Sequence, residues 1–320
     1  MKIGVLTVPF SSQPLEEVLP YLRGLGVRAV ELGTGGVTNK AHCDPALLLG
    51  HPERIARLKG LLRDNDMQIS ALSCHGNPVH PDAARAAADH QAFLDTVALA
   101  QELEVDTIVT FSGCPGDSPD SHYPNWVTCP WPDDFQKVLD YQWNGRLLPY
   151  WEKAARIARG GGVRVAIEMH PGFCVYNTET MLRLRAAVGD AVGANFDPSH
   201  LFWQGMDAVA AIRELGDAIH YAHAKDCRVD EGNTGRAGVL DTKHYSDVLH
   251  RAWVFRTVGY GHGEQVWRDI FSNLRLVGYD GVVSIEHEDS LMSVNEGLEK
   301  AVRFLQPLCI EEQPAEMWWA

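Results

Sequence analysis

Four apolar runs in the second half of the chain each end in a side chain that can bind a metal ion or move a proton. These residues are Glu168, Asp197, His223 and Glu286. Three carboxylates in one pocket repel one another unless a cation neutralises them. One imidazole with three carboxylates suits Mn²⁺, Co²⁺ or Mg²⁺, and Zn²⁺ also accepts such a set. The residue types therefore predict a site for one divalent metal ion, with Mn²⁺ as the first choice.

Each of these residues, taken alone, also has an ordinary structural explanation. Glu168 or Glu286 could pair with an arginine at the mouth of a barrel. Asp197 precedes Pro198 and could cap a helix, and His223 could be a hydrogen-bonded core histidine. Four such residues at the ends of successive strands are much harder to explain structurally, so the joint pattern favours the metal site.

The elements that must position these residues follow a regular alternation. Runs rich in apolar and β-branched residues are each followed by a segment of helical periodicity, which predicts parallel strands joined by crossover helices. The predicted strands are Ile3–Val8, Ala29–Leu32, Gln68–Ser73, Thr107–Phe111, Arg164–Met169, Gly193–Phe196, Ile219–Ala224 and Gly281–Ile285. The predicted helices are Leu15–Leu25, Glu53–Asn65, Asp82–Leu103, Leu148–Arg159, Thr178–Val188, Asp207–Leu215, Gln265–Val277 and Val294–Leu305.

Eight strand-helix repeats predict an α/β fold of the (β/α)8 TIM-barrel type, formed as a single domain by residues 1–320. Because the carboxyl ends of barrel strands meet at one mouth, the four polar side chains would point into a shared volume. Two βα connections are long, from Ser112 to about Gly145 and from Asp226 to about Gly263. Such loops are typically lids or binding loops. The first is rich in Pro, Trp and Cys, which predicts a rigid aromatic wall.

Charge and cysteine usage limit the partners and the compartment. The chain has 28 basic and 42 acidic residues and a net charge of −14, which disfavours nucleic acid and anionic lipid surfaces. No run approaches the ~20 apolar residues that span a bilayer. The 7 cysteines form no C-x-x-C pair and suit reduced thiols. We expect a cytoplasmic protein without a nucleic-acid or membrane partner.

Four motifs resemble the xylose isomerase-like barrel superfamily, and specifically its sugar phosphate isomerase/epimerase branch, which includes inosose dehydratases and ketose 3-epimerases. The resemblance covers essentially the whole chain. Its most specific pieces are Ile167-Glu-Met-His170, Asp197-Pro-Ser-His200, His223-Ala-Lys-Asp226 and Gly278-Tyr-Asp-Gly-Val-Val-Ser-Ile-Glu286. It implies that Glu168, Asp197, His223 and Glu286 bind the metal.

The resemblance also implies a mechanism. In epimerases of this family, two metal-bound glutamates lie on opposite faces of the sugar, where one removes a proton next to a carbonyl and the other returns it. Glu168 and Glu286 would take these catalytic roles, and a metal that chelates the substrate would stabilise the enediolate. The first prediction is therefore a divalent-metal-dependent sugar isomerase or epimerase.

Three residues next to the predicted ligands are candidates for substrate binding. His200 occupies the position where the family places a donor to a substrate oxygen, although it could simply be a residue at a helix N-terminus. Lys225 shares the inward face of its strand with His223 and could hold a substrate oxygen or pair with Asp226. His75 ends the third strand and could reach a sugar hydroxyl or be a buried structural histidine.

Further candidates lie in loops near the expected mouth. Arg256 and His262 precede the last helix-strand unit, where family members often contact substrate. Trp203 and Trp131 could stack on a sugar face or simply pack. We interpret His170 and His287 as residues that either support a metal ligand from behind or face outward.

Two departures from the motifs of family members argue against particular functions, DNA repair and epimerisation of a simple ketohexose. The fourth strand ends in Thr110-Phe-Ser-Gly-Cys114 without the histidine of the three-zinc DNA-repair members, and no Asp-x-His follows the seventh strand. Ketose 3-epimerases commonly have an arginine six residues after the metal histidine, where this chain has Val229. A simple ketohexose substrate is therefore in doubt.

Two other functions remain open. The first is a metal-dependent lyase that dehydrates a keto-cyclitol or eliminates the aglycone of a 3-keto-glycoside. The second is a non-catalytic or partner-dependent sugar-binding barrel, although binding alone would not require both glutamates. In each case the partner is a small sugar or cyclitol. Trp318-Trp319 is an apolar pair that could support a homo-oligomer.

Overall fold

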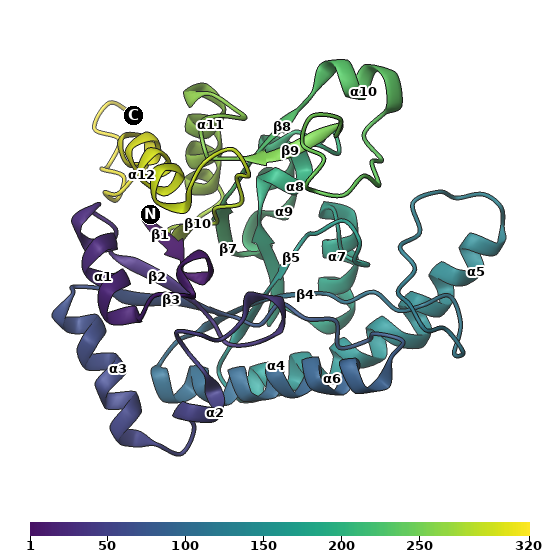
Figure 1. The fold of residues 1–320 in the computed structure, drawn as a ribbon, viewed down its shortest axis with the longest axis horizontal. Helices are drawn as coiled ribbons and strands as arrows, with labels where there is room; N and C mark the ends of the chain where they lie inside the picture. Colours follow the sequence, from purple (N-terminus) through teal and green to yellow (C-terminus); the bar gives the residue numbers. More distant parts are fainter.

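The computed structural model describes residues 1–320 and contains a closed barrel of eight parallel strands. In chain order the barrel strands are β1 (Lys2–Leu6), β2 (Ala29–Gly33), β3 (Gln68–Ser73), β4 (Thr107–Phe111), β5 (Arg164–Glu168), β6 (Val192–Phe196), β7 (Ile219–Ala224) and β10 (Val282–Ile285). β10 lies between β7 and β1 and closes the barrel. The predicted TIM-barrel fold class is confirmed (Figure 1).

One long helix follows each barrel strand on the outside of the barrel. These helices are α1 (Leu15–Gly24), α3 (Pro52–Asp64), α4 (Ala83–Leu103), α6 (Leu148–Gly160), α7 (Thr178–Val188), α9 (Ala208–Leu215), α11 (Glu264–Leu276) and α12 (Val294–Leu305). Several begin at a residue whose side chain accepts a hydrogen bond from a backbone N–H of the first turn, among them Asp82, Asn177, Asp207 and Ser293. The helix starts are therefore encoded locally.

The first predicted strand is too long by two residues. β1 ends at Leu6, and Val8–Phe10 forms a 3-10 turn. Pro9 has no amide hydrogen to donate to a neighbouring strand, so the strand cannot continue through it.

Both long loops contain secondary structure that the sequence analysis did not predict. In the second, β8 (Asp226–Val229) and β9 (Trp253–Arg256) form an antiparallel hairpin that encloses α10 (Glu231–Ala237). In the first, α5 (Asp134–Asp140) continues through a π-helical segment into α6. The helix therefore begins at Asp134 rather than Leu148. Figure 1 shows α5 and the loop before it projecting from the side of the barrel.

Two short helices lie close to the mouth. α2 (Pro45–Leu48) follows β2, and α8 (Pro198–Phe202) begins immediately after β6.

The N-terminus is held by residues near the end of the chain. The Met1 amino group contacts the Asp280 carboxylate at 2.6 Å and the Ile310 carbonyl oxygen at 2.8 Å. None of the helices combines the length and the apolar composition needed to cross a membrane.

A layer of buried residues, most of them small and apolar, fills the barrel on the amino-terminal side of the predicted site residues. It consists of Ala29, Ala71, Val109, Ala166, Tyr221 and Val282. The Tyr221 hydroxyl lies 2.6 Å from Ser70 Oγ, so its polar end is satisfied inside the barrel. This buried layer forms the floor beneath the polar side chains that lie farther along the strands.

We predict that His220 makes stability depend on pH. His220 Nδ1 lies 3.1 Å from the Val165 carbonyl oxygen, and burial lowers the pKa of His220 to about 4. The unfolded chain binds a proton below pH ~6.5 that the folded protein rejects, so the stabilisation is present above that pH and is lost as the pH falls toward 4.

Urea unfolding at several pH values checks this prediction. Between pH 7 and 4 the wild type should lose about 3 kcal/mol more than the His220→Gln variant, at ~1.4 kcal/mol for each unit of pKa shift. Parallel pH profiles for the two proteins would contradict it.

Candidate functional site

Inward-facing side chains recur at every second position of a barrel strand and form layers along its axis. The next layer, two residues farther along the strands than the apolar floor, is polar except for Phe111. It contains Glu31, Ser73, Phe111, Glu168, Asn195, His223 and Ser284. Two residues farther are His75, His170, Asp197, Lys225 and Glu286. The change from apolar to charged residues occurs within two layers, so the chemistry is confined to the mouth.

The structure brings the four predicted ligands together. Glu168, Asp197, His223 and Glu286 each offer one ligand atom, and these atoms lie within 4.8 Å of one another. His223 Nδ1 is 3.1 Å from Glu286 Oε2 and 3.7 Å from Glu168 Oε2. The side chains come from four consecutive strands of the barrel, β5, β6, β7 and β10, as the sequence analysis predicted.

Three of the converging atoms have no hydrogen-bond partner. They are Asp197 Oδ2, His223 Nδ1 and Glu286 Oε2. Glu286 Oε2 does lie 3.1 Å from His223 Nδ1 and 3.2 Å from Lys225 Nζ, but neither contact has hydrogen-bond geometry. Buried polar atoms almost always form hydrogen bonds in native proteins, so three that converge without one are arranged to bind a cation. Burial also raises the pKa of Asp197, which shows the cost of a carboxylate placed here without a cation. The residues therefore fit a divalent metal ion.

Two histidines hold Glu168 in its ionised form. His75 Nε2 lies 2.8 Å from one carboxylate oxygen, and His200 Nε2 lies 3.1 Å from the other. Burial opposes ionisation of Glu168, but the hydrogen bonds from His200 and His75 hold its pKa well below the ordinary value. Both histidines were predicted as substrate contacts, and the structure places both against this carboxylate.

Lys225 is a buried cation beside Glu286. Its Nζ lies 3.2 Å from Glu286 Oε2, 2.9 Å from Glu288 Oε2 and 4.4 Å from the centre of the Phe255 ring. Burial favours the neutral amine, yet the carboxylates of Glu286 and Glu288 hold the pKa of Lys225 well above its ordinary value. The alternative that Lys225 pairs with Asp226 is wrong, because the next side chain along an extended strand faces the other way.

Asp226 instead organises the loop that follows β9. One of its carboxylate oxygens accepts hydrogen bonds from the backbone N–H groups of Gly259, Gly261 and His262, at 3.0, 3.1 and 2.9 Å. Its other oxygen lies 2.8 Å from His262 Nδ1. The His262 ring stacks on Phe202 with a centroid distance of 3.8 Å. His262 therefore has a complete structural role.

Four predicted substrate contacts do not line the cavity at the mouth. They are His262, Arg256, Trp203 and His200, and His200 contacts Glu168 instead. Arg256 Nε donates a hydrogen bond to Asp289 Oδ2 at 3.1 Å. Trp203 is buried and stacks on Trp253 with a centroid distance of 4.6 Å. A substrate role for these residues stays a prediction.

The cavity at the mouth has a volume of about 670 Å³. His75, Glu168, Lys225 and Glu286 form its polar end, and an apolar wall faces them, made of Leu6, Val8, Phe111, Phe173, Phe255 and Met292. Phe111 and Phe173 stack at 4.2 Å. The loop after β4 does not contribute to this cavity: no residue between 112 and 147 lines it, and Trp131 is 74% exposed. A contact between this loop and a substrate stays a prediction.

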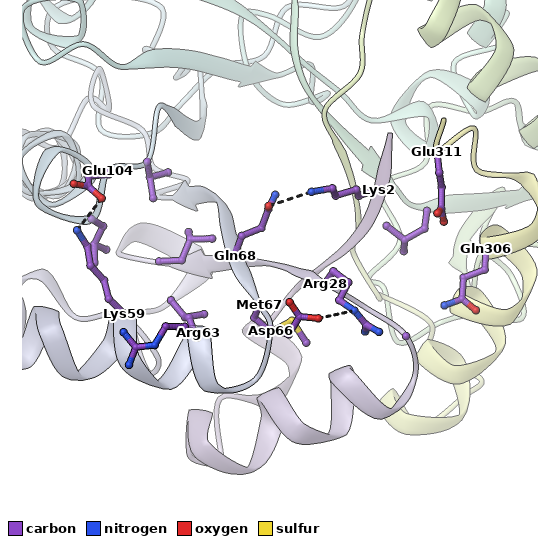
Figure 2. Close-up of a pocket in the computed structure, with 16 residues that line it drawn as sticks. Lys2, Arg28, Lys59, Arg63, Asp66, Met67, Gln68, Glu104, Gln306 and Glu311 are labelled. Atoms are coloured by element: carbon purple, nitrogen blue, oxygen red, sulfur yellow. Dashed lines mark hydrogen bonds and ion pairs between the residues drawn. The ribbon is translucent and has the colours of Figure 1, made fainter. Parts of the chain in front are cut away.

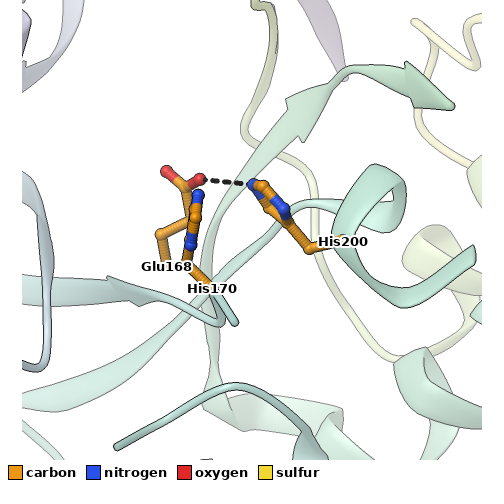
Figure 3. A group of neighbouring side chains, drawn as sticks. All are labelled: Glu168, His170 and His200. Atoms are coloured by element: carbon orange, nitrogen blue, oxygen red, sulfur yellow. Dashed lines mark hydrogen bonds and ion pairs between the residues drawn. The ribbon is translucent and has the colours of Figure 1, made fainter. Parts of the chain in front are cut away.

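A second group of possible ligands consists of Glu168, His170 and His200 (Figure 3). His170 Nδ1 lies 2.6 Å from the Pro171 carbonyl oxygen, and burial lowers the pKa of His170 to about 3, so its ring is neutral. His170 lines the cavity rather than facing outward, and the half-buried His287 lines it as well. Because this group shares Glu168 with the four-residue cluster, we describe both as one site.

A larger cavity of about 870 Å³ lies at the opposite, amino-terminal end of the strands (Figure 2). Its charged side chains pair among themselves: Lys59 with Glu104 at 3.2 Å and Arg28 with Asp66 at 3.4 Å. These pairs are partly exposed, so solvent screens them, and no buried polar atom of the lining lacks a partner. Nothing there resembles the chemistry of the mouth.

Sequence reasoning missed Glu31. It is fully buried in β2, and its Oε2 lies 3.0 Å from His223 Nε2. The sequence did contain a signal, because Glu31 is the only charged residue in the apolar segment Ala29-Val-Glu-Leu-Gly33. Every residue of this segment is buried.

This fold and this site define a TIM barrel with a candidate divalent-metal centre at its carboxyl-terminal mouth. The family model described as "Xylose isomerase-like TIM barrel" matches residues 19–308, and the chain belongs to this family.

Individual relatives include both characterised and uncharacterised proteins. YfiH of Bacillus subtilis (strain 168), an uncharacterized protein, is 38% identical over 310 residues, which are 96% of this chain and 98% of YfiH. The inosose dehydratase of Geobacillus kaustophilus (strain HTA426) is 29% identical over 154 residues, 48% of each protein. Among solved structures, a D-psicose 3-epimerase aligns with a TM-score of 0.62 at 16% identity, over 96% of this chain and 99% of the epimerase. At that identity the likeness shows the fold alone.

We predict that Lys225 stabilises the metal-free protein. Replacing it with methionine keeps most of the side-chain volume but leaves Glu286 and the neighbouring carboxylates without their buried cation. Removing one partner of a buried ion pair costs roughly 3–5 kcal/mol. Urea unfolding in the presence of a chelator should show a loss in this range for Lys225→Met. The control Lys40→Met removes an exposed pair with Asp44 and should cost less than about 1 kcal/mol. Equal small losses for both variants would contradict the prediction.

Proposed function

We propose that this protein is a divalent-metal-dependent isomerase or epimerase that removes a proton next to the carbonyl of a sugar or cyclitol-like substrate. The observation that carries the proposal is the convergence of the unpartnered atoms of Asp197, His223 and Glu286 beside Glu168. The site opens into a cavity that can hold a small molecule. Family relatives are enzymes, and both epimerases and dehydratases occur among them.

The proposed ligands are Glu168, Asp197, His223 and Glu286. Mn²⁺ is the first choice because three carboxylates and one imidazole form an oxygen-rich set. When bound, a dication in this site supplies a Lewis acid that polarises the substrate carbonyl and stabilises the charge of the enediolate.

The two glutamates have environments that suit proton transfer in opposite directions. Both line the cavity, from β5 and from the end of β10. Two histidines hold Glu168 ionised, and Lys225 does the same for Glu286, whose pKa is lowered despite its burial. Each can therefore begin a turnover as a base. An epimer forms when the other glutamate first takes a proton from solvent or a substrate hydroxyl and then delivers it to the opposite face of the same carbon.

Lys225, His75 and His200 are the best-placed substrate contacts of those proposed. All three are buried side chains at the polar end of the mouth, and Lys225 and His75 line the cavity. The Lys225 ammonium would orient a substrate oxygen before the proton moves. The Nε2 atoms of His75 and His200 contact Glu168, and His75 Nδ1, which has no partner, would accept a hydrogen bond from a substrate hydroxyl.

We predict that Glu286→Gln lowers proton exchange by about 10²- to 10⁴-fold, because an amide cannot accept the proton. The measurement is deuterium incorporation next to the substrate carbonyl, in Mn²⁺-loaded protein at a metal concentration that saturates the variant. The matched control is Glu288→Gln, which alters the other carboxylate beside Lys225 and should retain exchange within several-fold. Undiminished turnover in Glu286→Gln would overturn the two-glutamate mechanism.

A second candidate function keeps the same first step and then expels a leaving group. The size and apolar wall of the cavity favour it, because about 670 Å³ lies within the roughly 300–1,000 Å³ range of pockets that hold drug-sized ligands. A substrate with an apolar group beyond the sugar ring would use Phe173, Phe255 and Met292. Dehydration of a keto-cyclitol or elimination from a 3-keto-glycoside would follow.

The product identifies the reaction. Mn²⁺-loaded protein is incubated in D₂O with ketoses, inososes and 3-keto-glucosides, and the products are followed by NMR. We expect deuterium next to the carbonyl and an isomeric product. Loss of water or of the aglycone would establish the lyase instead. Binding of Mn²⁺ without exchange on any substrate would favour a non-catalytic or partner-dependent sugar-binding barrel.

A further inference from the structure

The proposed ligand His223 has a second partner on the side away from the other ligands. Its Nε2 lies 3.0 Å from Glu31 Oε2 and 3.2 Å from Glu31 Oε1, whereas its Nδ1 faces Glu168 and Glu286. The imidazole ring therefore lies between the Glu31 carboxylate of β2, which contacts Nε2, and the proposed metal site, which Nδ1 faces.

We propose that Glu31 is a positioning residue that selects the metal-binding form of His223 and thereby strengthens binding of the divalent metal. The inference rests on the metal site of the proposed function. Glu31 acts through His223 and does not touch the substrate cavity, whose lining excludes it.

The surroundings of Glu31 fix its carboxylate. The side chain is fully buried, and Ser73 Oγ donates a hydrogen bond to Oε1. The backbone of the same residue is held as well, because its carbonyl oxygen accepts from the N–H of Thr7 at 3.1 Å. No lysine or arginine pairs with Glu31, and His223 is its one ion-pair partner in the structure. The carboxylate is therefore held by Ser73 and has the imidazole as its one partner that can carry charge.

The chemistry of the imidazole explains why this matters. A neutral histidine carries one N–H, and the other nitrogen keeps a lone pair that can bind a metal. Glu31 is an acceptor for Nε2–H, so it favours the tautomer with the proton on Nε2. Nδ1 is then left with its lone pair toward the ligands, and it is the nitrogen without a hydrogen-bond partner. A carboxylate behind a metal-binding histidine also increases the basicity of the ring.

A purely structural role would have a different signature. In that case Glu31 would satisfy a buried ring nitrogen and contribute only to the free energy of unfolding. Glu31→Gln separates the two roles, because glutamine retains the shape and an acceptor oxygen but loses the negative charge. Its amide N–H can also donate to Nε2 and favour the wrong tautomer.

The test measures metal affinity directly, without a substrate. Purified full-length protein is stripped with a chelator and titrated with Mn²⁺ by calorimetry at pH 7.5, and circular dichroism verifies that each variant is folded. We expect Glu31→Gln to raise the Kd for Mn²⁺ by about 10- to 100-fold. Ser73→Ala should shift the Kd in the same direction by less, because it frees the carboxylate without removing it.

The matched control is Ser70→Ala, which removes the hydrogen bond to Tyr221 within the same barrel interior but contacts no proposed ligand. It should lower stability and leave the Kd unchanged. Long-range ¹H–¹⁵N spectra of the Zn²⁺-loaded wild type should show His223 protonated at Nε2.

The outcomes are distinguishable. An unchanged Kd in folded Glu31→Gln, or Nδ1 protonation in the loaded wild type, would overturn the positioning role while leaving the metal site intact. If Glu31→Gln does not fold, an unchanged Kd in Ser73→Ala overturns the positioning role. Absence of Mn²⁺ binding by the wild type would instead overturn the proposed function.

Discussion

The constraint on which the rest of this structure depends is the repulsion among buried carboxylates at the barrel mouth. Glu31, Glu168, Asp197 and Glu286 lie within two layers of side chains, and Lys225 is the one buried lysine among them. Histidines share the negative charge through hydrogen bonds, but three ligand atoms remain without partners. A site of this composition is stabilised by positive charge, which His223 and Lys225 supply in part, and the barrel supplies the rigidity that keeps the carboxylates from moving apart.

The two-residue repeat of side-chain direction along a β-strand explains how the barrel gathers buried polar residues at its carboxyl-terminal mouth. Because side chains alternate along each strand, Ala166 and Glu168 face the same interior at different heights, as do Tyr221 and His223. Closure of the barrel then brings together residues that are more than 100 positions apart in sequence, such as Glu168 and Glu286. The apolar floor lies below them, and the cavity that Glu168 and Glu286 line is at the mouth.

The sequence was sufficient for the barrel and for the four clustered residues because both depend on local patterns. Strand-helix alternation and polar strand ends are visible without a structure. Glu31 escaped notice because it lies within its strand rather than at the end, although its charge in an apolar run is the same kind of signal. Arg256, His262 and Trp203 depend on how the loops fold. Asp226 gathers backbone N–H groups from residues 259–262, and no sequence pattern reveals that such a loop turns its side chains away from the cavity.

The separation between strands and loops at this mouth has an evolutionary consequence. The polar end of the cavity lies at the ends of barrel strands or within two residues of them. Phe173, Phe255 and Met292 of the apolar wall lie farther out, on the connection after β5, on the β8–β9 hairpin and after β10. Mutations in those connections can reshape the cavity without moving a carboxylate. Changes of specificity can therefore arise in the loops while the carboxylates and histidines of the mouth stay in place. A lineage of such proteins can diverge without passing through a member that has lost its site.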